Sequence, residues 1–220
     1  MEFYGEKKGI YFTNPRLDLI KLVPANPANK ILEIGAGGGD TLVEIKKLNL
    51  ASEVIGVDLM PVPDSNQDNP LIDKFIVCDV EKTDLPYSEG YFDIILLGDV
   101  VEHLFDPWSF LQKMSRLLKK DGIFIASLPN IRYYTAMYKV FFKGDFGYES
   151  DGLFDKTHFR FFCKKNIFDL FNTDQFKCTR IISRNRLLGL KGKKELFDIL
   201  TFRVFEEFFA RQYIVVSKKL

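Results

Sequence analysis

The stretch Lys30–Asp40, which reads KILEIGAGGGD, decides the fold of this chain. An apolar strand runs into a turn in which four of the five positions from 35 to 39 are glycine, and an amphipathic helix follows. Glycine has no Cβ and accepts a positive φ, so the backbone of such a turn can pass close to a ligand. The amides at the start of the next helix point into the same crevice. Glu33 lies two positions before the first glycine, which suits a ligand with a positive charge. We therefore expect a site for a cationic nucleoside.

The composition restricts the class of protein. With 220 residues, of which 46% are hydrophobic, the chain is long enough for one well-buried domain, and we expect a single domain over residues 1–220. The balance of 31 basic against 30 acidic residues predicts no binding of duplex nucleic acid. Three widely spaced cysteines without a CxxC pair indicate neither a disulfide framework nor a zinc cluster. The N-terminal residues do not resemble a signal peptide, and no apolar run approaches the roughly 20 residues that a membrane helix needs. We therefore expect a soluble, cytoplasmic protein.

From residue 30 onward, short apolar runs of β type alternate with helical periods, which predicts an α/β fold with a parallel sheet and right-handed crossovers. Three prolines between Asp58 and Asp73 favour a loop there over a full helix. The expected strands are Ile31–Ile34, Glu53–Val57, Lys74–Cys78, Phe92–Leu97, Gly122–Ser127, Phe176–Ser183 and Arg211–Ser217. The expected helices are Pro15–Val23, Thr41–Leu48, Pro107–Lys119 (ended by Asp121-Gly122), Lys164–Phe171 and Lys193–Phe209.

Two segments depart from this alternation. Residues 1–29 are interpreted as an N-terminal arm or cap, whose Tyr4, Tyr11 and Arg16 could close one side of the ligand pocket. Residues 130–157 form an aromatic insertion, rich in tyrosine and phenylalanine. Its rings could pack as a cap over the sheet, or they could form a lid whose faces stack on a sugar, a ring or a lipid-linked acceptor. In the second case Tyr134 is a candidate contact for the substrate.

Acidic residues close three of the expected strands: Asp58 the second, Asp79 the third and Asp99 the fourth. A carboxylate about 20 residues beyond a glycine turn is placed to accept hydrogen bonds from both ribose hydroxyls. The alternative is that aspartate is simply favourable in turns and at helix starts. Because the carboxyl ends of parallel strands meet at one edge of a sheet, the repetition over three strands favours a ligand site.

A nicotinamide-dependent oxidoreductase would also contain a glycine turn and an acidic residue for the ribose. Its fingerprint places a small residue three positions after the second glycine, and here that position is Asp40. A carboxylate at the helix N-terminus would occupy the place of the pyrophosphate. The sequence therefore favours a nucleoside without phosphates.

The order of these motifs resembles the class I S-adenosylmethionine-dependent methyltransferases. The likeness is carried by Glu33-x-Gly35-x-Gly37-x-Gly39, then Asp58, Asp79, the strand FDIILL at 92–97 and the sequence LKKDG at 118–122. It covers residues 30–130 as ordered motifs. The resemblance implies a Rossmann-like sheet of seven mostly parallel strands with helices on both faces, in which the last strand is antiparallel and lies beside the fifth.

The resemblance also implies that the cofactor is S-adenosylmethionine, with S-adenosylhomocysteine as product. The residues that it places around the cofactor are Glu33, Gly35, Ala36, Gly37 and Gly39 for the methionine part, Gly98 and Asp99 for the methyl side, Asp58 for the ribose, and Leu59, Met60, Asp79 and Val80 for the adenine.

A narrower likeness concerns the acceptor. The sequence DVVEHLFDP at 99–107 resembles the small-molecule and sugar O-methyltransferases, a branch that includes quinone methyltransferases. The segments at 127–130 and 155–162 resemble members associated with cell-envelope or polysaccharide modification. This likeness implies O-methylation of a small-molecule or saccharide-type acceptor. The alternatives are an NAD-dependent oxidoreductase and a non-catalytic protein that binds the cofactor.

Methyl transfer is an in-line displacement, so the protein mainly holds the reacting atoms in line and excludes water. A hydroxyl acceptor also needs a base, and histidine is suited to neutral pH. His103 and His158 are the two histidines of the chain, and each is either this base or a structural residue. Arg160, near His158, could bind an anionic or polyhydroxylated acceptor. No metal cluster is evident from the spacing, so we expect no metal-dependent mechanism. The oligomeric state is left open.

Overall fold

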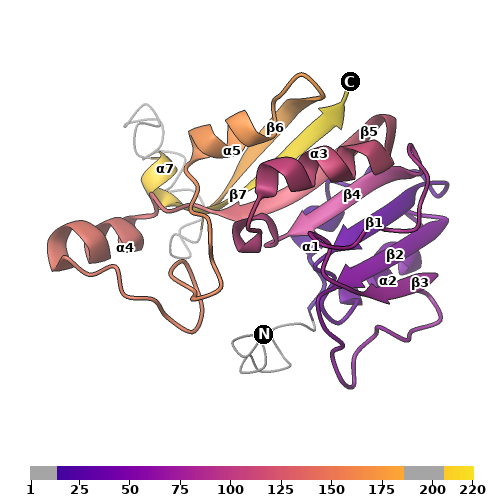
Figure 1. Ribbon diagram of the computed structural model, residues 1–220, viewed down its shortest axis with the longest axis horizontal. Helices are drawn as coiled ribbons and strands as arrows, with labels where there is room; N and C mark the ends of the chain where they lie inside the picture. The colour runs from indigo at the N-terminus through magenta and orange to yellow at the C-terminus, as the bar shows by residue number, and fades with distance from the viewer. Residues whose placement is uncertain (1–13, 186–205) are drawn as a thin grey trace.

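A mixed seven-stranded sheet lies at the centre of the described protein, which comprises residues 14–185 and 206–220 of a computed structural model (Figure 1). The strand order is β3-β2-β1-β4-β5-β7-β6. Strands β1 to β5 pair in parallel, whereas β7 is antiparallel to both β5 and β6. The strands are β1 Lys30–Ile34, β2 Glu53–Asp58, β3 Lys74–Val77, β4 Phe92–Gly98, β5 Leu118–Pro129, β6 Phe176–Asn185 and β7 Ala210–Lys219. The predicted fold class is confirmed, including the antiparallel last strand beside the fifth.

Alternating side chains of the strands form two cores, one on each face of the sheet. In β4, Ile95 and Leu97 are buried in one core, and Ile94 and Leu96 in the other. Successive strand residues point to opposite faces, so a strand covered on both faces is apolar throughout. Helices α1 Leu17–Ile20 and α2 Asp40–Lys47 cover one core, and α3 Pro107–Leu117 and α5 Lys164–Leu170 cover the other. The prediction of helices on both faces is thus confirmed.

Helix α3 and strand β5 meet earlier than the sequence predicted. The helix begins as expected, with Pro107 in its first turn and the Asp106 side chain accepting a hydrogen bond from the Ser109 amide. It ends at Leu117, however, and β5 starts at Leu118. The pairing with β4 shifts register just beyond this point, and Asp121 has a φ of +65°. Asp121-Gly122 therefore belongs to an irregularity inside the strand and does not end the helix.

The loop predicted between Asp58 and Asp73 is confirmed, because no helix forms there. It folds back over the glycine turn: the Asn66 amide donates to the Gly38 carbonyl at 2.8 Å, and Gln67 Nε2 donates to the Gly37 carbonyl at 2.7 Å. The loop therefore helps to fix the shape of the turn.

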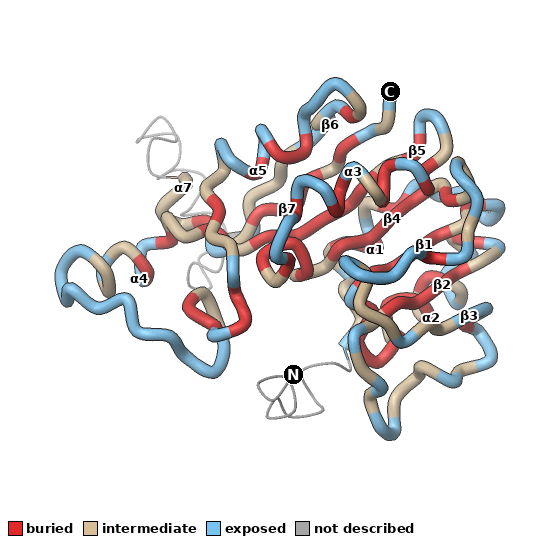
Figure 2. Tube along the Cα trace, in the orientation of Figure 1, coloured by how far each residue is buried: buried red, intermediate tan, exposed pale blue. Residues whose placement is uncertain are grey.

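The aromatic insertion projects away from the sheet (Figures 1 and 2). It contains the short helix α4 Tyr134–Met137 and a π-helical turn, η4, at Tyr138–Phe142. Phe141 and Phe142 are 72% and 82% exposed, so these rings do not pack as a cap over the sheet. The interpretation of the insertion as a lid stays a prediction.

Two other predicted features lie partly outside the described residues. Of the N-terminal arm, residues 1–13, which include Tyr4 and Tyr11, are not described. Of the helix expected at Lys193–Phe209, only its end is described, as α7 Glu206–Phe209. Within the described ranges no helix has the length and apolar character needed to cross a membrane.

Candidate active site

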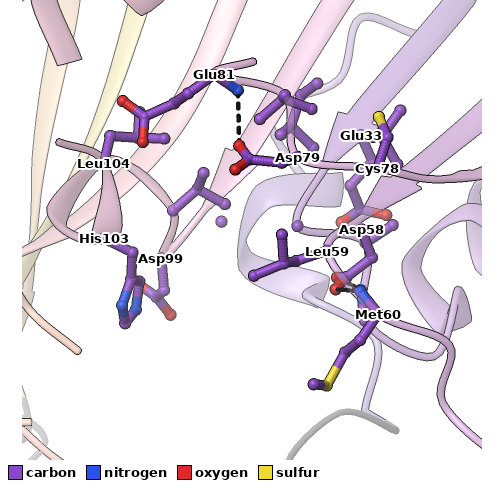
Figure 3. A pocket seen from close by; sticks show the side chains of 18 of the residues that line it. Glu33, Asp58, Leu59, Met60, Cys78, Asp79, Glu81, Asp99, His103 and Leu104 are labelled. Atoms are coloured by element: carbon purple, nitrogen blue, oxygen red, sulfur yellow. Dashed lines mark hydrogen bonds between the residues drawn. The ribbon is translucent and has the colours of Figure 1, made fainter. Parts of the chain in front are cut away.

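A cleft of about 510 Å³ opens at the carboxyl ends of β1, β2 and β4, where a parallel sheet of this order places its ligands. Figure 3 shows Asp58, Leu59 and Met60 on one side of the hollow, and Asp99 and His103 across from them. The predicted cofactor residues that line it are Glu33, Gly35, Ala36, Gly37, Asp58, Leu59, Met60, Asp79, Val80, Gly98 and Asp99.

The glycine turn forms the floor of this cleft. Gly35 has a φ of +69°, and a Cβ built there would lie 2.4 Å from Val100 Cγ2. The position therefore favours glycine both for its backbone angle and for the close approach of the Val100 side chain. The Gly37 amide donates to Asp58 Oδ2 at 2.7 Å, which connects the turn to the end of β2.

Glu33 is a carboxyl group at the base of the cleft and only 3% exposed. Burial raises its pKa to about 8, although a hydrogen bond with Thr41 and the charge of Arg16 oppose the rise. Within the described part of the chain, its Oε2 atom has no hydrogen-bond partner. A buried carboxyl oxygen without a hydrogen-bond partner costs free energy, and a cationic group bound in the cleft would pair with it.

The carboxylates that end β2 and β3 differ in their surroundings. Burial raises the pKa of Asp58, and the Gly37 amide partly offsets this effect. Asp79 instead contacts Lys82 at 2.7 Å, and this hydrogen bond lowers its pKa. Asp79 Oδ1 also accepts from the Glu81 amide, as the dashed line in Figure 3 marks. Both carboxylates face the cleft, as predicted from their places at the strand ends.

Asp99 is the most heavily contacted of the three strand-end carboxylates. Its Oδ2 accepts from Arg16 Nη1 at 2.7 Å, and its Oδ1 accepts from Ser127 Oγ at 3.0 Å and from Gln212 Nε2. Its φ is +58°, an uncommon value for a residue with a side chain, and such strain is found where the surrounding structure fixes a functional group. Burial lowers the pKa of Arg16, but Asp99 and Asp18 outweigh that effect and hold it above its ordinary value.

A second cleft, of about 440 Å³, adjoins the first and shares Asp99 with it. Its lining is largely polar and includes Glu102, His158, Arg184 and Arg211. His103 lines the first cleft and His158 the second, yet their ring centroids are only 4.7 Å apart. The fold therefore brings both predicted histidines to the place where the two clefts meet.

The remaining predicted residues lie elsewhere. Gly39 supports the turn from behind, where a Cβ would meet Ile72. Tyr134 stands in the insertion and lines neither of the two clefts. The Arg160 guanidinium lies 5.7 Å from the ring centroids of both Phe105 and Trp108, and it too is not among the lining residues of either cleft.

The start of α2 bears on the predicted alternative of a nicotinamide cofactor. Asp40 is the first residue of this helix, and its Oδ1 accepts from Asn66 Nδ2 at 3.1 Å. A protein carboxylate thus already interacts with the positive end of the helix dipole. A pyrophosphate at this N-terminus would meet a like charge.

Several residues of the two clefts were not identified from the sequence. Thr41, Glu102, Ser127, Arg184, Arg211 and Gln212 reach the site from α2, the segment after β4, β5, β6 and β7. Glu102 and Ser127 lie in the segments 99–107 and 127–130, whose likeness carries no role for these two residues, and the other four belong to no motif. Glu102 could have been noticed, because it directly precedes His103.

Comparison with known proteins agrees with this geometry. Residues 32–126 match a family model described as a methyltransferase domain. A ubiquinone biosynthesis O-methyltransferase from Pelagibacter ubique is 34% identical over 108 residues, which are 45% of this chain and 42% of that protein. A ubiquinone/menaquinone biosynthesis C-methyltransferase from Citrifermentans bemidjiense is 24% identical over 136 residues, 56% of each chain. This chain thus spans about half the length of the curated relatives it matches.

The solved structures show the same fold at greater sequence distance. An S-adenosylmethionine-dependent methyltransferase from Mesorhizobium loti gives a TM-score of 0.63 at 16% identity, and the match covers 93% of this chain and 96% of that one. At this identity the likeness concerns the fold.

Proposed function

We propose that this chain is a class I S-adenosylmethionine-dependent methyltransferase that methylates a hydroxyl group of a small-molecule or saccharide-type acceptor. The observation that carries the proposal is Glu33, a buried carboxyl group with an unpartnered oxygen at the base of the cleft. S-adenosylmethionine carries an ammonium and a sulfonium charge and no phosphate, so its methionine end fits this position. Asp58 accepts the ribose hydroxyls, and Leu59 and Met60 flank the adenine.

The cofactor supplies an electrophilic methyl group on its sulfonium. In the transfer, a lone pair of the acceptor oxygen forms the new O–C bond while the S–C bond breaks, and its electron pair goes to sulfur. The sulfonium becomes a neutral thioether, and the acceptor loses its hydroxyl proton. The roles of the chain are to hold the reacting atoms in line, to exclude water and to promote the loss of that proton.

Two observations support an acceptor in the second cleft. The cleft adjoins the first one at Asp99, and its polar lining, which holds both arginines (Arg184 and Arg211) and carboxylates (Asp99, Glu102 and Asp151), suits a hydroxylated molecule. The O-methyltransferase relative supports oxygen as the accepting atom, whereas the C-methyltransferase relative makes transfer to carbon the second candidate. Phenols and saccharides are both included in the proposed class.

Titration calorimetry with S-adenosylhomocysteine and with NAD tests the cofactor assignment. We expect saturable binding of the former only. Asp58→Ala should weaken that binding by about 1–3 kcal/mol, the cost of losing charge-assisted hydrogen bonds. Asp174→Ala, a change at an exposed aspartate outside both clefts, serves as the control and should leave the affinity unaltered. Binding of NAD alone, or equal binding by the two variants, would refute the cofactor assignment.

The acceptor is tested with methyl-labelled cofactor against panels of phenols, hydroxylated quinone precursors and saccharides. Label recovered as a methyl ether supports transfer to oxygen. Label recovered on a ring carbon would refute transfer to oxygen and support transfer to carbon.

A further inference from the structure

Glu102, His103 and His158 form a cluster at the meeting point of the two clefts. Glu102 and His103 lie in the single 3-10 turn η3 Val101–His103, directly after β4, and His158 follows the aromatic insertion. One ligand atom from each side chain can be chosen so that all three lie within 4.8 Å of one another. Glu102 is 1% exposed and His158 is 8% exposed, so this is a cluster of buried groups and not a patch of surface charge.

The backbone fixes which nitrogen each ring presents to the cluster. His103 Nδ1 lies 3.0 Å from the Thr157 carbonyl, and His158 Nδ1 lies 3.1 Å from the Leu153 carbonyl. Because a carbonyl oxygen only accepts, each Nδ1 must carry a hydrogen, and the lone pair of each neutral ring is then at Nε2. Histidines that bind metals are usually held in this way, with one ring nitrogen donating to a carbonyl and the other binding the ion.

The two segments that carry the cluster are also joined to each other. The amides of Phe159 and Arg160 donate to the Glu102 carbonyl at 2.9 and 3.1 Å. Asp155 Oδ1 accepts from both the amide and the hydroxyl of Thr157, at 2.8 and 2.7 Å. The relative position of the three side chains is therefore set by the protein before any ligand binds, as a metal site requires.

We propose that Glu102, His103 and His158 bind a divalent transition-metal ion, which holds the acceptor oxygen between the two clefts. Two imidazoles and one carboxylate form the ligand set of catalytic zinc sites, which keep a further position open for substrate. Imidazole ligands favour zinc and its first-row neighbours over magnesium and calcium, which prefer oxygen. The Asp99 carboxylate is held by Arg16 and Ser127, so we do not assign it to the ion, and we assign the open position to the acceptor oxygen.

The binding of the ion is independent of the proposed function, whereas its role in methyl transfer rests on it. A hydroxyl bound to a divalent cation loses its proton more readily, as metal-bound water does. The proton leaves to water in the second cleft, and the oxygen lone pair then attacks the methyl group as described above. A purely basic role for one histidine would need neither the second histidine nor Glu102.

The site is tested by titrating metal-stripped protein with Co²⁺, followed by its visible absorption, and with Zn²⁺ by calorimetry. We expect one Co²⁺ per chain, displaced by Zn²⁺. The variants Glu102→Gln and His158→Gln each remove a proposed metal ligand. They should therefore weaken the Co²⁺ affinity by more than the ~10–100-fold that is typical when a residue that only hydrogen-bonds to a metal ligand is removed. The control variant Glu89→Gln, at an exposed glutamate outside both clefts, should bind like the wild type.

Affinity for S-adenosylhomocysteine separates the outcomes. Variants that keep this affinity but lose the metal are folded and support the site. Wild-type protein that binds S-adenosylhomocysteine but shows no Co²⁺ absorption overturns the metal site and leaves the proposed function standing. Protein that binds Co²⁺ through these residues but does not bind S-adenosylhomocysteine supports the metal site and overturns the proposed function. Equal Co²⁺ affinity in the wild type and both cluster variants would also overturn the inference.

Discussion

Neutralising Glu33 should make the ligand-free protein more stable at high pH. Its carboxyl group has a pKa near 8 in the folded protein against an ordinary value of 4.5, because it is buried. Between these two values the unfolded chain has released the proton and the folded chain has kept it, so stability falls as the pH rises through this window. The shift corresponds to a loss of about 3 kcal/mol by pH 7 and about 5 kcal/mol by pH 9.

The Glu33→Gln variant has no titrating group at this position and should not suffer that loss. Urea denaturation of both proteins at pH 5, 7 and 9 measures the difference directly. We expect the stability of the variant relative to wild type to rise by about 4 kcal/mol from pH 5 to pH 9. A difference that does not change with pH would show that Glu33 is ionised in the folded protein, and the reasoning from burial would be wrong.

The same group should couple cofactor binding to proton release. At pH 7 a carboxyl group of pKa about 8 is mostly protonated, and a cationic ligand favours its charged form. Calorimetry in buffers of different ionisation enthalpy should therefore detect the release of a large fraction of one proton per S-adenosylmethionine bound at pH 7. In Glu33→Gln this release should be absent, whatever the residual affinity.

Three further substitutions test other parts of the structure. Gly35→Ala should destabilise the protein by on the order of 1–3 kcal/mol in urea denaturation. Adding Val100→Ala should recover the part of this loss that is due to the 2.4 Å contact with Val100, but not the part that is due to the positive φ. Full recovery of stability in the double variant would contradict the argument from the backbone angle. Arg16→Met removes the cation beside Asp99 and should cost about 1–3 kcal/mol in thermal denaturation; unchanged stability would mean that solvent replaces this contact. Phe142→Ser, at an 82% exposed ring, should change stability by less than about 0.5 kcal/mol and leave S-adenosylhomocysteine affinity intact; if the insertion is a lid, turnover alone should fall.

The residues that the sequence assigned to the cofactor lie together in one cleft, because the pattern that places them is local. Glu33, the glycine turn and Asp58 are read directly from strands whose parallel order follows from the βαβ pattern, so their meeting at one sheet edge was expected. The end of α3 was misplaced because Asp121-Gly122 has the chemistry of a helix stop and here serves a strand irregularity instead.

The second cleft and the cluster of Glu102, His103 and His158 could not be predicted in the same way, because their residues meet only in three dimensions. His103 and His158 were singled out separately, and neither the sequence nor the motif order indicates that their rings lie side by side with Glu102. Gln212 reaches Asp99 from a strand far along the chain, by a contact that no local pattern records. The sequence also gives no sign that Phe141 and Phe142 are exposed while Tyr133 and Phe154 of the same insertion are buried, because exposed and buried rings have the same composition.

The place of β7 between β5 and β6 has a consequence for how the protein folds. Strands β1 to β4 all come from residues 30–98, and helix and loop connections can join them early. In contrast, β5 can pair early with β4 along one edge, but its other edge must wait for β7 at Ala210–Lys219, and within the described chain β6 pairs only with β7. Closing long loops is slow, so pairings of high sequence separation tend to form late. We expect pulse-labelling hydrogen exchange during refolding to protect the amides of β1 and β4 before those of β6 and β7, so that the strands behind the first cleft form before those that carry Arg184, Arg211 and Gln212 into the second cleft.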